Sequence, residues 1–320
     1  MPRAAGALLG LLVLAAAIAA GLTVGNQHVL TLTIQIMILA ALATSWNILG
    51  GFAGQISLGH SAFFGLGALI TRELWLGGQA FPVAVAAAVG VTALAAVVVG
   101  VPMLRFRDIY FAIGTLALGV AVYITAGNLW PGISSLPAEV LRSYDFTGPY
   151  FFALGVLVAA ILVSVWLERS KLGLGMMTVR EDEEAAKATG VDVFAHKLAA
   201  FVISAAVATL AGSAFAYFSV SHYPNFAFSV IWTFEAVLVV FIGGIGTLVG
   251  PLLGSIFFIL GRDLMPTDVD EFQVVFFGLL FIVVVLLFPG GLSQAAGRLL
   301  GRAGERSTAT DRPTAARGRS

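Results

Sequence analysis

The chain has 320 residues, of which 59% are hydrophobic and 11% are charged, whereas soluble globular domains average about 25% charged residues. This surface is too apolar for a water-soluble fold, so we expect lipid to solvate the chain. The 17 basic and 17 acidic residues balance to zero net charge, which argues against nucleic-acid binding, and the lack of cysteine excludes disulfides, thiolate metal sites and cysteine nucleophiles.

Ten apolar runs are candidates for helices that cross about 30 Å of hydrocarbon. They cover residues 4–24, 28–49, 52–71, 80–101, 108–128, 149–167, 198–221, 230–248, 250–264 and 272–289. The sequence therefore predicts an all-α, polytopic membrane protein with a transmembrane domain over residues 1–290. The first run starts like a signal peptide but is longer than a signal h-region, so we treat it as a helix. The polar third run and the short, Gly-rich ninth run are each predicted as continuous, broken or re-entrant.

Basic residues collect on one side of these spans. The N-terminus and residues 102–107, 168–197 and 290–320 hold 14 of the 17, whereas the other side holds Arg72, Arg142 and Arg262 with seven acidic residues. Because positively charged loops stay in the cytoplasm, both termini are predicted to be cytoplasmic. The Arg-rich tail, residues 291–320, cannot build an apolar core and is predicted to be disordered.

The cytoplasmic segment 168–197 carries 11 of the 34 charged residues. Thr178 is predicted to N-cap a helix over 178–189, and Gly190 to end it. Acidic residues in its first turns complement the positive end of the helix dipole: Glu181, Asp182, Glu183 and Glu184. From charge alone, a solvated connecting helix is the favoured interpretation.

The pattern Glu184-Ala185-Ala186, followed four residues later by Gly190, resembles the EAA loop of ABC importer permeases, which docks on the ATPase subunit. Three further stretches are similar to permease subunits of branched-chain amino acid ABC importers. They are Gly54 to Ala68, with the pattern Gly-Gln-x-Ser-Leu-Gly; Tyr110 to Ala117; and Arg180 to Glu183 through Glu235 and Gly243 to Pro251. The resemblance covers most of the chain between residues 45 and 260.

This resemblance implies a non-catalytic subunit that imports branched-chain or related hydrophobic amino acids across a bacterial inner (plasma) membrane. The implied partners are a second, identical or homologous permease, two cytoplasmic ATPase subunits and an extracytoplasmic substrate-binding protein. ATP would be bound by the ATPase subunits, since this chain lacks a phosphate-loop motif and any nucleophile-base constellation, and no cofactor is expected. The residues implied in ATPase coupling are Arg180, Glu181, Asp182, Glu184, Ala185, Ala186 and Gly190. A sugar or urea/amide permease of the same superfamily, or an ion-coupled secondary transporter, remains an alternative.

Polar residues inside the spans are candidates for the substrate pathway: Gln55, Ser57, His60, Ser61, Tyr110, Thr115 and Glu235. Those of the third span either bond across helix contacts or, if the span is broken, leave backbone groups open to an amino acid. Glu235 is the only acidic residue well inside a span, where a charge costs about 2.5–3.5 kcal/mol, so it should line the pathway, pair with the third span or bond between helices. His60 is favoured as a packing donor, and Gly59, Gly65 and Gly67 as close helix contacts. The four histidines are too scattered to suggest a metal site.

Overall fold

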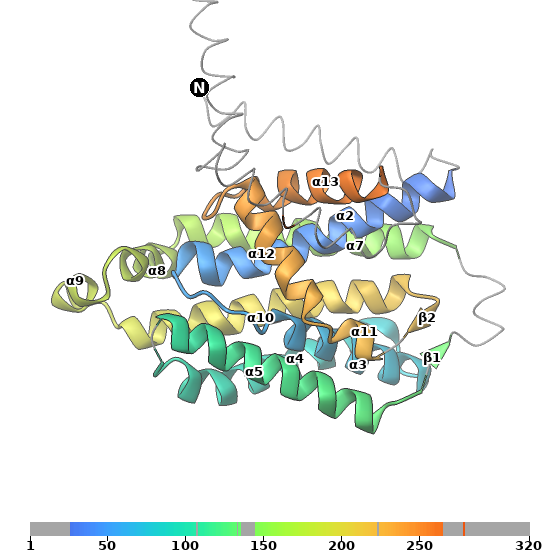
Figure 1. Ribbon diagram of the computed structural model, residues 1–320, viewed down its shortest axis with the longest axis horizontal. Helices are drawn as coiled ribbons and strands as arrows, with labels where there is room; N and C mark the ends of the chain where they lie inside the picture. Colours follow the sequence, from blue (N-terminus) through green and yellow to red (C-terminus); the bar gives the residue numbers. More distant parts are fainter. Residues whose placement is uncertain are drawn as a thin grey trace, which may run out of the picture.

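The computed structural model describes residues 26–106, 108–132, 134–135, 145–222, 224–264 and 278, a part of the chain that is almost entirely helical (Figure 1). Its elements in chain order are α2 (Gln27–Asn47), the π-helical η1 (Ile48–Phe52), α3 (His60–Leu76), α4 (Phe81–Met103), α5 (Asp108–Leu129), β1 (Ser134–Ser135), α7 (Thr147–Arg169), α8 (Lys171–Glu181), α9 (Glu183–Ala188), α10 (Val193–Phe218), β2 (Ser221–His222), α11 (Pro224–Ala227), α12 (Ile231–Gly243) and α13 (Gly250–Asp263). The two short strands pair antiparallel, with Ser134 opposite His222. The predicted helical class is confirmed.

In the described part of the chain, five helices are long and apolar enough to cross a membrane: α2 continued by η1, α4, α5, α7 and α10. They coincide with the second, fourth, fifth, sixth and seventh predicted spans. The predicted spans 4–24 and 272–289, both chain ends and the tail 291–320 lie outside the described residues, apart from residue 278. The count of ten spans and the cytoplasmic placement of both termini therefore stay predictions.

The third predicted span is broken. The helix from α2 ends in the π-helical turn η1, residues 53–59 are not helical, and α3 begins only at His60 and continues to Leu76. Gly54 has φ +71°, a left-handed conformation that glycine adopts without strain. Of the alternatives for residues 52–71, the broken segment is therefore confirmed, with its break at the start of the run.

The eighth and ninth predicted spans are short helices. α12 ends at Gly243, well before residue 248, because Gly244 (φ +117°) and Gly246 (φ +72°) turn the chain. α13 is continuous over 14 residues, so the broken alternative for the ninth span is wrong. At 1.5 Å per residue each helix is about 20 Å long, less than the roughly 30 Å of the hydrocarbon core. Neither α12 nor α13 crosses that thickness alone.

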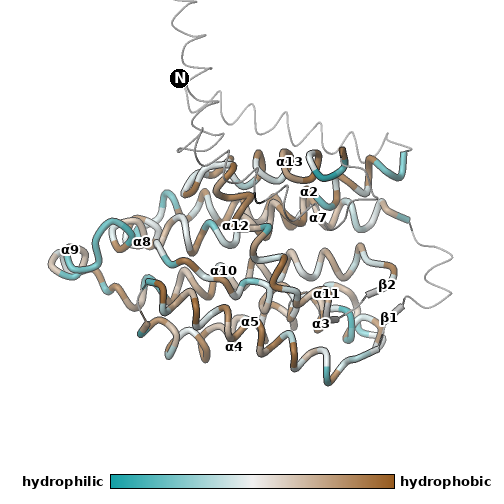
Figure 2. The backbone as a smooth tube through the Cα atoms, viewed as in Figure 1, coloured by the Kyte–Doolittle hydropathy of each residue, from teal (hydrophilic) through white to brown (hydrophobic). Residues whose placement is uncertain are grey.

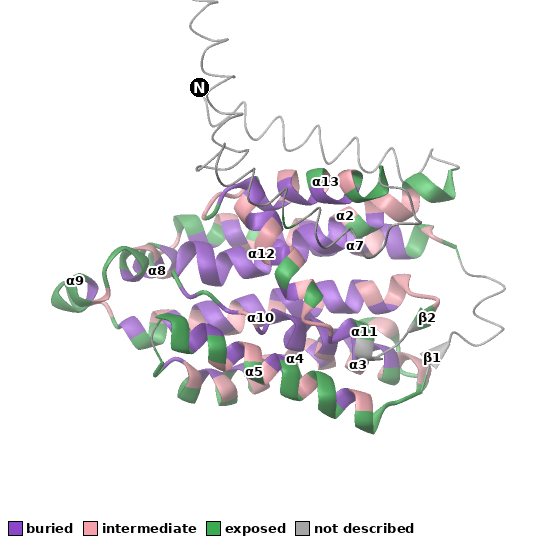
Figure 3. Ribbon diagram, viewed as in Figure 1, coloured by how far each residue is buried: buried purple, intermediate pink, exposed green. Residues whose placement is uncertain are grey.

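Helix α10 lies at the centre and packs against α2, α3, α4 and α7, and its buried residues form much of the middle of the bundle in Figure 3. A Cβ atom at Gly67 would overlap the backbone of Thr209, and one at Gly212 would overlap that of Phe64, so α3 and α10 approach closely. The predicted close helix contact is confirmed for Gly67 and for Gly59, which lies against the backbone of Thr115 in α5, whereas Gly65 lies against the ring of Phe228, just after α11.

The outer faces of α4 and α5 are apolar and exposed. Leu94 and Val98 of α4 are 66% and 65% exposed, and Ile109 of α5 is 65% exposed. Hydrophobic colour covers most of the helices in Figure 2, whereas hydrophilic colour gathers at α9. Such an exterior suits lipid or another apolar partner.

Arg72 near the end of α3 is fully buried, although it was predicted in an external loop. Its guanidinium donates hydrogen bonds to the carbonyls of Ala216, Ser219 and Val220, at 3.1, 2.9 and 3.0 Å. These carbonyls belong to the end of α10 and the residues after it, where the helix dipole is negative. Arg72 therefore holds α3 against the C-terminus of α10.

Candidate functional site

The predicted coupling helix is two helices, α8 and α9, which meet at Asp182. The backbone of Asp182 is extended, with φ −162° and ψ 117°, and its carboxylate accepts hydrogen bonds from the amides of Glu184 (2.8 Å) and Ala185 (3.0 Å). The prediction that Thr178 caps the helix is wrong. Thr178 lies inside α8, where its hydroxyl donates to the carbonyl of Leu174 at 2.9 Å. Asp182 satisfies the free amides at the start of α9.

The predicted end of the helix at Gly190 is confirmed. Gly190 has φ +85°, its amide donates to the carbonyl of Lys187 (2.9 Å), and the amide of Val191 donates to that of Ala186 (3.0 Å). These two bonds form a Schellman motif, which requires a left-handed residue at the position of Gly190. A side chain there would strain the turn.

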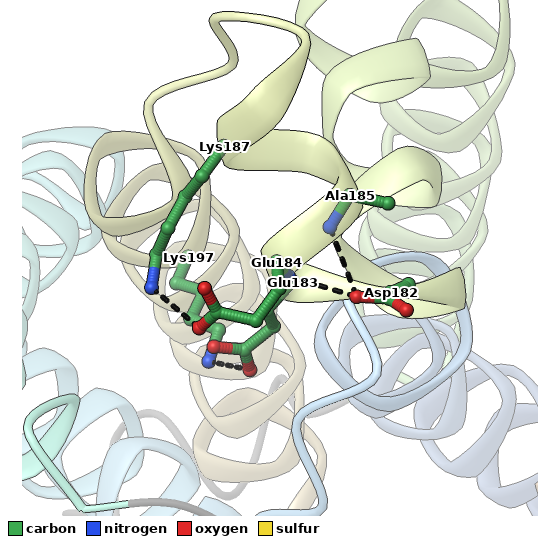
Figure 4. A network of polar contacts seen from close by, with 6 residues as sticks. All are labelled: Asp182, Glu183, Glu184, Ala185, Lys187 and Lys197. Atoms are coloured by element: carbon green, nitrogen blue, oxygen red, sulfur yellow. Dashed lines mark hydrogen bonds and ion pairs between the residues drawn. The ribbon is translucent and has the colours of Figure 1, made fainter.

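One face of α9 packs on its own chain. Ala186 is fully buried in a small apolar cluster with Val179 and Val193, whereas Ala185 is exposed. Glu183 pairs with Lys197 of α10, whose side chain is only 4% exposed, and Lys187 pairs with Glu184 at 2.9 Å on the surface (Figure 4). Both alanines were expected to face a partner, but of the two only Ala185 is exposed. Glu184, Lys187 and Gly190 are exposed as well.

Arg180 joins α8 to η1 and to the non-helical residues 53–59 that follow it, the broken segment. Its Nη1 donates to the carbonyl of Gly51 in η1 at 2.7 Å, and its side chain lies against Gly54. Glu181 accepts from the same guanidinium at 2.5 and 3.1 Å and so orients it. A charge-assisted hydrogen bond thus connects α8 directly to η1.

Asn47 joins the same region to the turn between α12 and α13. Its side-chain amide donates to the carbonyl of Thr247 (3.0 Å) and its carbonyl oxygen accepts from the amide of Gly246 (2.8 Å). The sequence places two Gly-rich stretches, 50–51 and 243–250, before short apolar runs, and the structure brings them into contact through Gly51 and Gly246. Arg180 and Asn47 thus connect three parts of the chain.

Most pathway candidates of the third span lie together, but their polar groups are largely occupied. Indole Nε1 of Trp46 donates to the carbonyl of Ser57 (2.7 Å), the amide of Leu58 to the hydroxyl of Thr115 (3.0 Å), and the amide of Ser61 to the hydroxyl of Thr233 (2.8 Å). The broken segment is therefore fastened to its neighbours, which favours the packing role over open backbone groups. Gln55 is also buried, whereas Tyr110, at the start of α5, is 70% exposed and lies apart from the group.

His60 is fully buried and bonded as a packing residue. Its Nε2 lies 2.7 Å from the hydroxyl of Ser204, which itself donates to the carbonyl of Ser45 at 2.7 Å. The chain of bonds ties α3 to α10 and α2, so the predicted packing role of His60 is supported. Among the described residues, His60 Nδ1, Ser61 Oγ and Thr92 Oγ1 are buried without a hydrogen-bond partner.

Glu235 lies in a different place from the other candidates. Its side chain is 17% exposed, and its Oε1 is 3.5 Å from Nη1 of Arg262 in the last turn of α13. Of the alternatives for Glu235, pairing with the third span is wrong, and the structure shows a bond between helices α12 and α13, formed by Glu235 and Arg262. Both residues line a cavity of about 320 Å³ between α2, α10, α12 and α13. Nearby, Asp263 pairs with His28 at 3.3 Å.

Within the described residues no group of three or more histidine or carboxylate side chains is placed to hold a metal ion. The two candidate regions that remain are the polar helix pair α8–α9 with its link to η1, and the charged cavity beside Glu235. The first is suited to contact another protein, and the second to bind a small molecule.

Comparison with known proteins assigns the chain to a family. Residues 28–285 match the model of the family described as "Branched-chain amino acid transport system / permease component". The chain belongs to this family. It is therefore an integral membrane protein, the permease component of an ABC-type transporter, and no enzymatic family is indicated.

Relatives with assigned names support this placement. The high-affinity branched-chain amino acid transport system permease protein LivM is 30% identical in Escherichia coli K12 and 29% identical in Salmonella typhimurium, each over 89% of this chain and 74% of the relative. The autoinducer 2 import system permease protein LsrC of Enterobacter sp. strain 638 is 29% identical over 82% of this chain and 78% of its own length. No solved structure matches the chain significantly.

Proposed function

We propose that this permease moves branched-chain or related hydrophobic amino acids inward, driven by two ATPase subunits that dock on α8 and α9. The observation that carries the proposal is the helix pair itself. α9 presents Glu184, Ala185 and Lys187 at the surface, and α8 is bonded through Arg180 to Gly51 of η1 inside the bundle. A docked ATPase would thus act on the membrane helices through a short path.

The charge distribution supports a cytoplasmic position for α8 and α9, because positively charged loops stay on that side. The segment 168–197 holds five of the 14 basic residues assigned there. ATP would be bound and hydrolysed by the ATPase subunits, since this chain carries no phosphate-loop motif. A second permease, identical or homologous, and an extracytoplasmic binding protein would complete the importer, and no cofactor is required.

The docking role is tested in the full complex, reconstituted in liposomes with its ATPase and binding protein. Glu184→Ala should abolish the stimulation of ATP hydrolysis by substrate-loaded binding protein, while insertion and folding are retained, because its exposed pair with Lys187 contributes less than about 1 kcal/mol. Gly190→Ala should have the same effect by straining the end of α9. Glu168→Ala, an exposed change at the end of α7 outside α8 and α9, is the matched control. Normal stimulation in both test variants would reject the docking role.

A second candidate substrate is a sugar-like compound, since one relative is an autoinducer 2 import permease. Thermal shifts of the cognate binding protein with leucine, isoleucine, valine, urea and ribose distinguish the candidates. Stabilisation by ribose alone would replace the amino acid by a sugar and leave the permease role intact. Uptake by liposomes without any ATPase would instead support an ion-coupled transporter.

A further inference from the structure

We infer that the cavity beside Glu235 and Arg262 is a binding site for one zwitterionic amino acid with an apolar side chain. Glu235 would bind its ammonium group and Arg262 its carboxylate. The inference rests on the proposed function and deepens it, because it assigns the substrate class to residues of the permease. It is independent of the ATPase contact at α8 and α9.

The cavity has the size and lining of a small-molecule site. Its volume of about 320 Å³ is near the lower limit of ligand pockets, which suits a single small molecule. Most of its wall is apolar, with contributions from Ile38, Leu39, Phe215, Phe218, Trp232 and Ile259. A branched aliphatic side chain would be buried against this wall, and aromatic rings supply much of the contact area.

The two charges come from different helices. Glu235 lies in the second turn of α12, and Arg262 lies in the last turn of α13, where the negative end of that helix dipole stabilises its charge. Their atoms are 3.5 Å apart, longer than the roughly 2.7–2.9 Å of a tight charge-assisted hydrogen bond. Because the contact between Glu235 and Arg262 is long, a ligand ammonium group can bind Glu235 and a ligand carboxylate can bind Arg262 in its place.

Neighbouring groups leave these two charges available. Asp263 also lines the cavity, but His28 lies 3.3 Å from its carboxylate. Gln35 adds a neutral polar side chain from α2. Glu235 is only 17% exposed and Arg262 is 49% exposed, so water screens their charges only in part. A ligand with a positive group for Glu235 and a negative group for Arg262 therefore binds more tightly than a ligand with neither group. A neutral sugar or urea would supply neither.

The cavity lies at the end of the bundle opposite α8 and α9. α10 begins five residues after α9 ends, and its 26 residues extend about 39 Å. Phe215 and Phe218, in its last turn, line the cavity, so the cavity is at the far end of that helix. With α8 and α9 in the cytoplasm, it is on the side where a binding protein would deliver substrate.

The first test measures binding by protection of a single thiol in the full chain, assembled with its partner subunits in nanodiscs. The chain has no cysteine, so Gln35→Cys places a unique thiol in the cavity, and Gln79→Cys places one in the exposed turn between α3 and α4 as the control. Leucine should slow modification of the first thiol by a charged methanethiosulfonate reagent and leave the second unchanged. Ribose and urea should slow neither.

The second test assigns the two charges by truncated ligands: 4-methylpentanoate, which is leucine without its ammonium group, and 3-methylbutylamine, which lacks the carboxylate. In the unaltered protein both should protect at least about tenfold less well than leucine, since a charged hydrogen-bonding partner is lost. In Glu235→Gln, leucine should protect no better than 4-methylpentanoate but still better than 3-methylbutylamine. In Arg262→Gln, leucine should protect no better than 3-methylbutylamine but still better than 4-methylpentanoate. Glu73→Gln, an exposed carboxylate of α3, should change neither ratio.

The outcomes separate this inference from the proposed function. If the complex transports leucine but leucine does not protect the cavity thiol, or if both ratios are unchanged in the variants, the cavity site is wrong and the amino acid importer stands. If ribose protects the thiol as well as leucine does, the zwitterion assignment is wrong. If no amino acid is transported, the proposed function itself fails.

Discussion

Arg180 offers the sharpest perturbation of the link between α8 and the bundle. Its Nη1 donates a 2.7 Å hydrogen bond to the carbonyl of Gly51 in η1, and hydrogen bonds to charged groups contribute about 1.5–3 kcal/mol. Because the side chain is 36% exposed, the effective value falls toward about 1–2 kcal/mol. Arg180→Gln keeps a donor but removes the charge and shortens the reach, so it should break the link without unfolding the chain.

The expected result is uncoupling. A loss of 1.4 kcal/mol corresponds to a tenfold change in an equilibrium. The ratio of ATP hydrolysed to substrate transported should therefore rise roughly five- to thirtyfold if the bond forms in one transport state only. The ratio is measured in proteoliposomes from phosphate release and radiolabelled uptake on the same sample. The melting temperature in detergent should change little.

Arg169→Gln is the matched control, because it removes a positive charge from an exposed residue of the same cytoplasmic segment, at the end of α7 and outside α8 and α9. If Arg180→Gln and Arg169→Gln give the same ratio as the unaltered protein, the reasoning that Arg180 transmits movement is refuted. A rise in both would show that loop charge, rather than the bond to Gly51, sets the coupling.

Two further changes test what holds the helices together. Arg72→Met should lower the free energy of unfolding by about 3 kcal/mol or more, since three carbonyls at and just after the end of α10 lose a buried charged donor. Thermal melting in detergent compares this variant with Arg105→Met, a change at an exposed residue. An equal shift of the melting temperature in both variants would contradict the role of Arg72. Glu183→Gln should cost about 2–3 kcal/mol, below the 3–5 of fully buried pairs because Glu183 is 29% exposed, and adding Lys197→Met should recover most of the loss. A double variant no more stable than the single one would show that the ion pair is not the cause.

The local features of α8 and α9 show how far sequence reasoning reaches. Gly190 was predicted to end the helix, and it does, because a left-handed residue after a helix is encoded at one position. Asp182 rather than Thr178 is the N-cap, although both residue types cap helices well. The choice was made by the packing of Val179 on Ala186 and Val193, which keeps Thr178 inside α8.

The sequence by itself determined that the chain lies in lipid, that it is helical, and where most spans begin and end approximately. An apolar run of about 20 residues has few other stable forms in lipid. Its motifs also indicated the family that the comparison confirmed. Only the tertiary structure decided which polar groups meet. Arg180 and Gly51 are 129 residues apart, Asn47 and Gly246 are 199 apart, and Glu235 pairs with Arg262 rather than with the third span. Those contacts depend on how the helices rotate and cross, which is set by close packing at residues such as Gly67 and Gly212 and has no signature in the periodicity of a single apolar run.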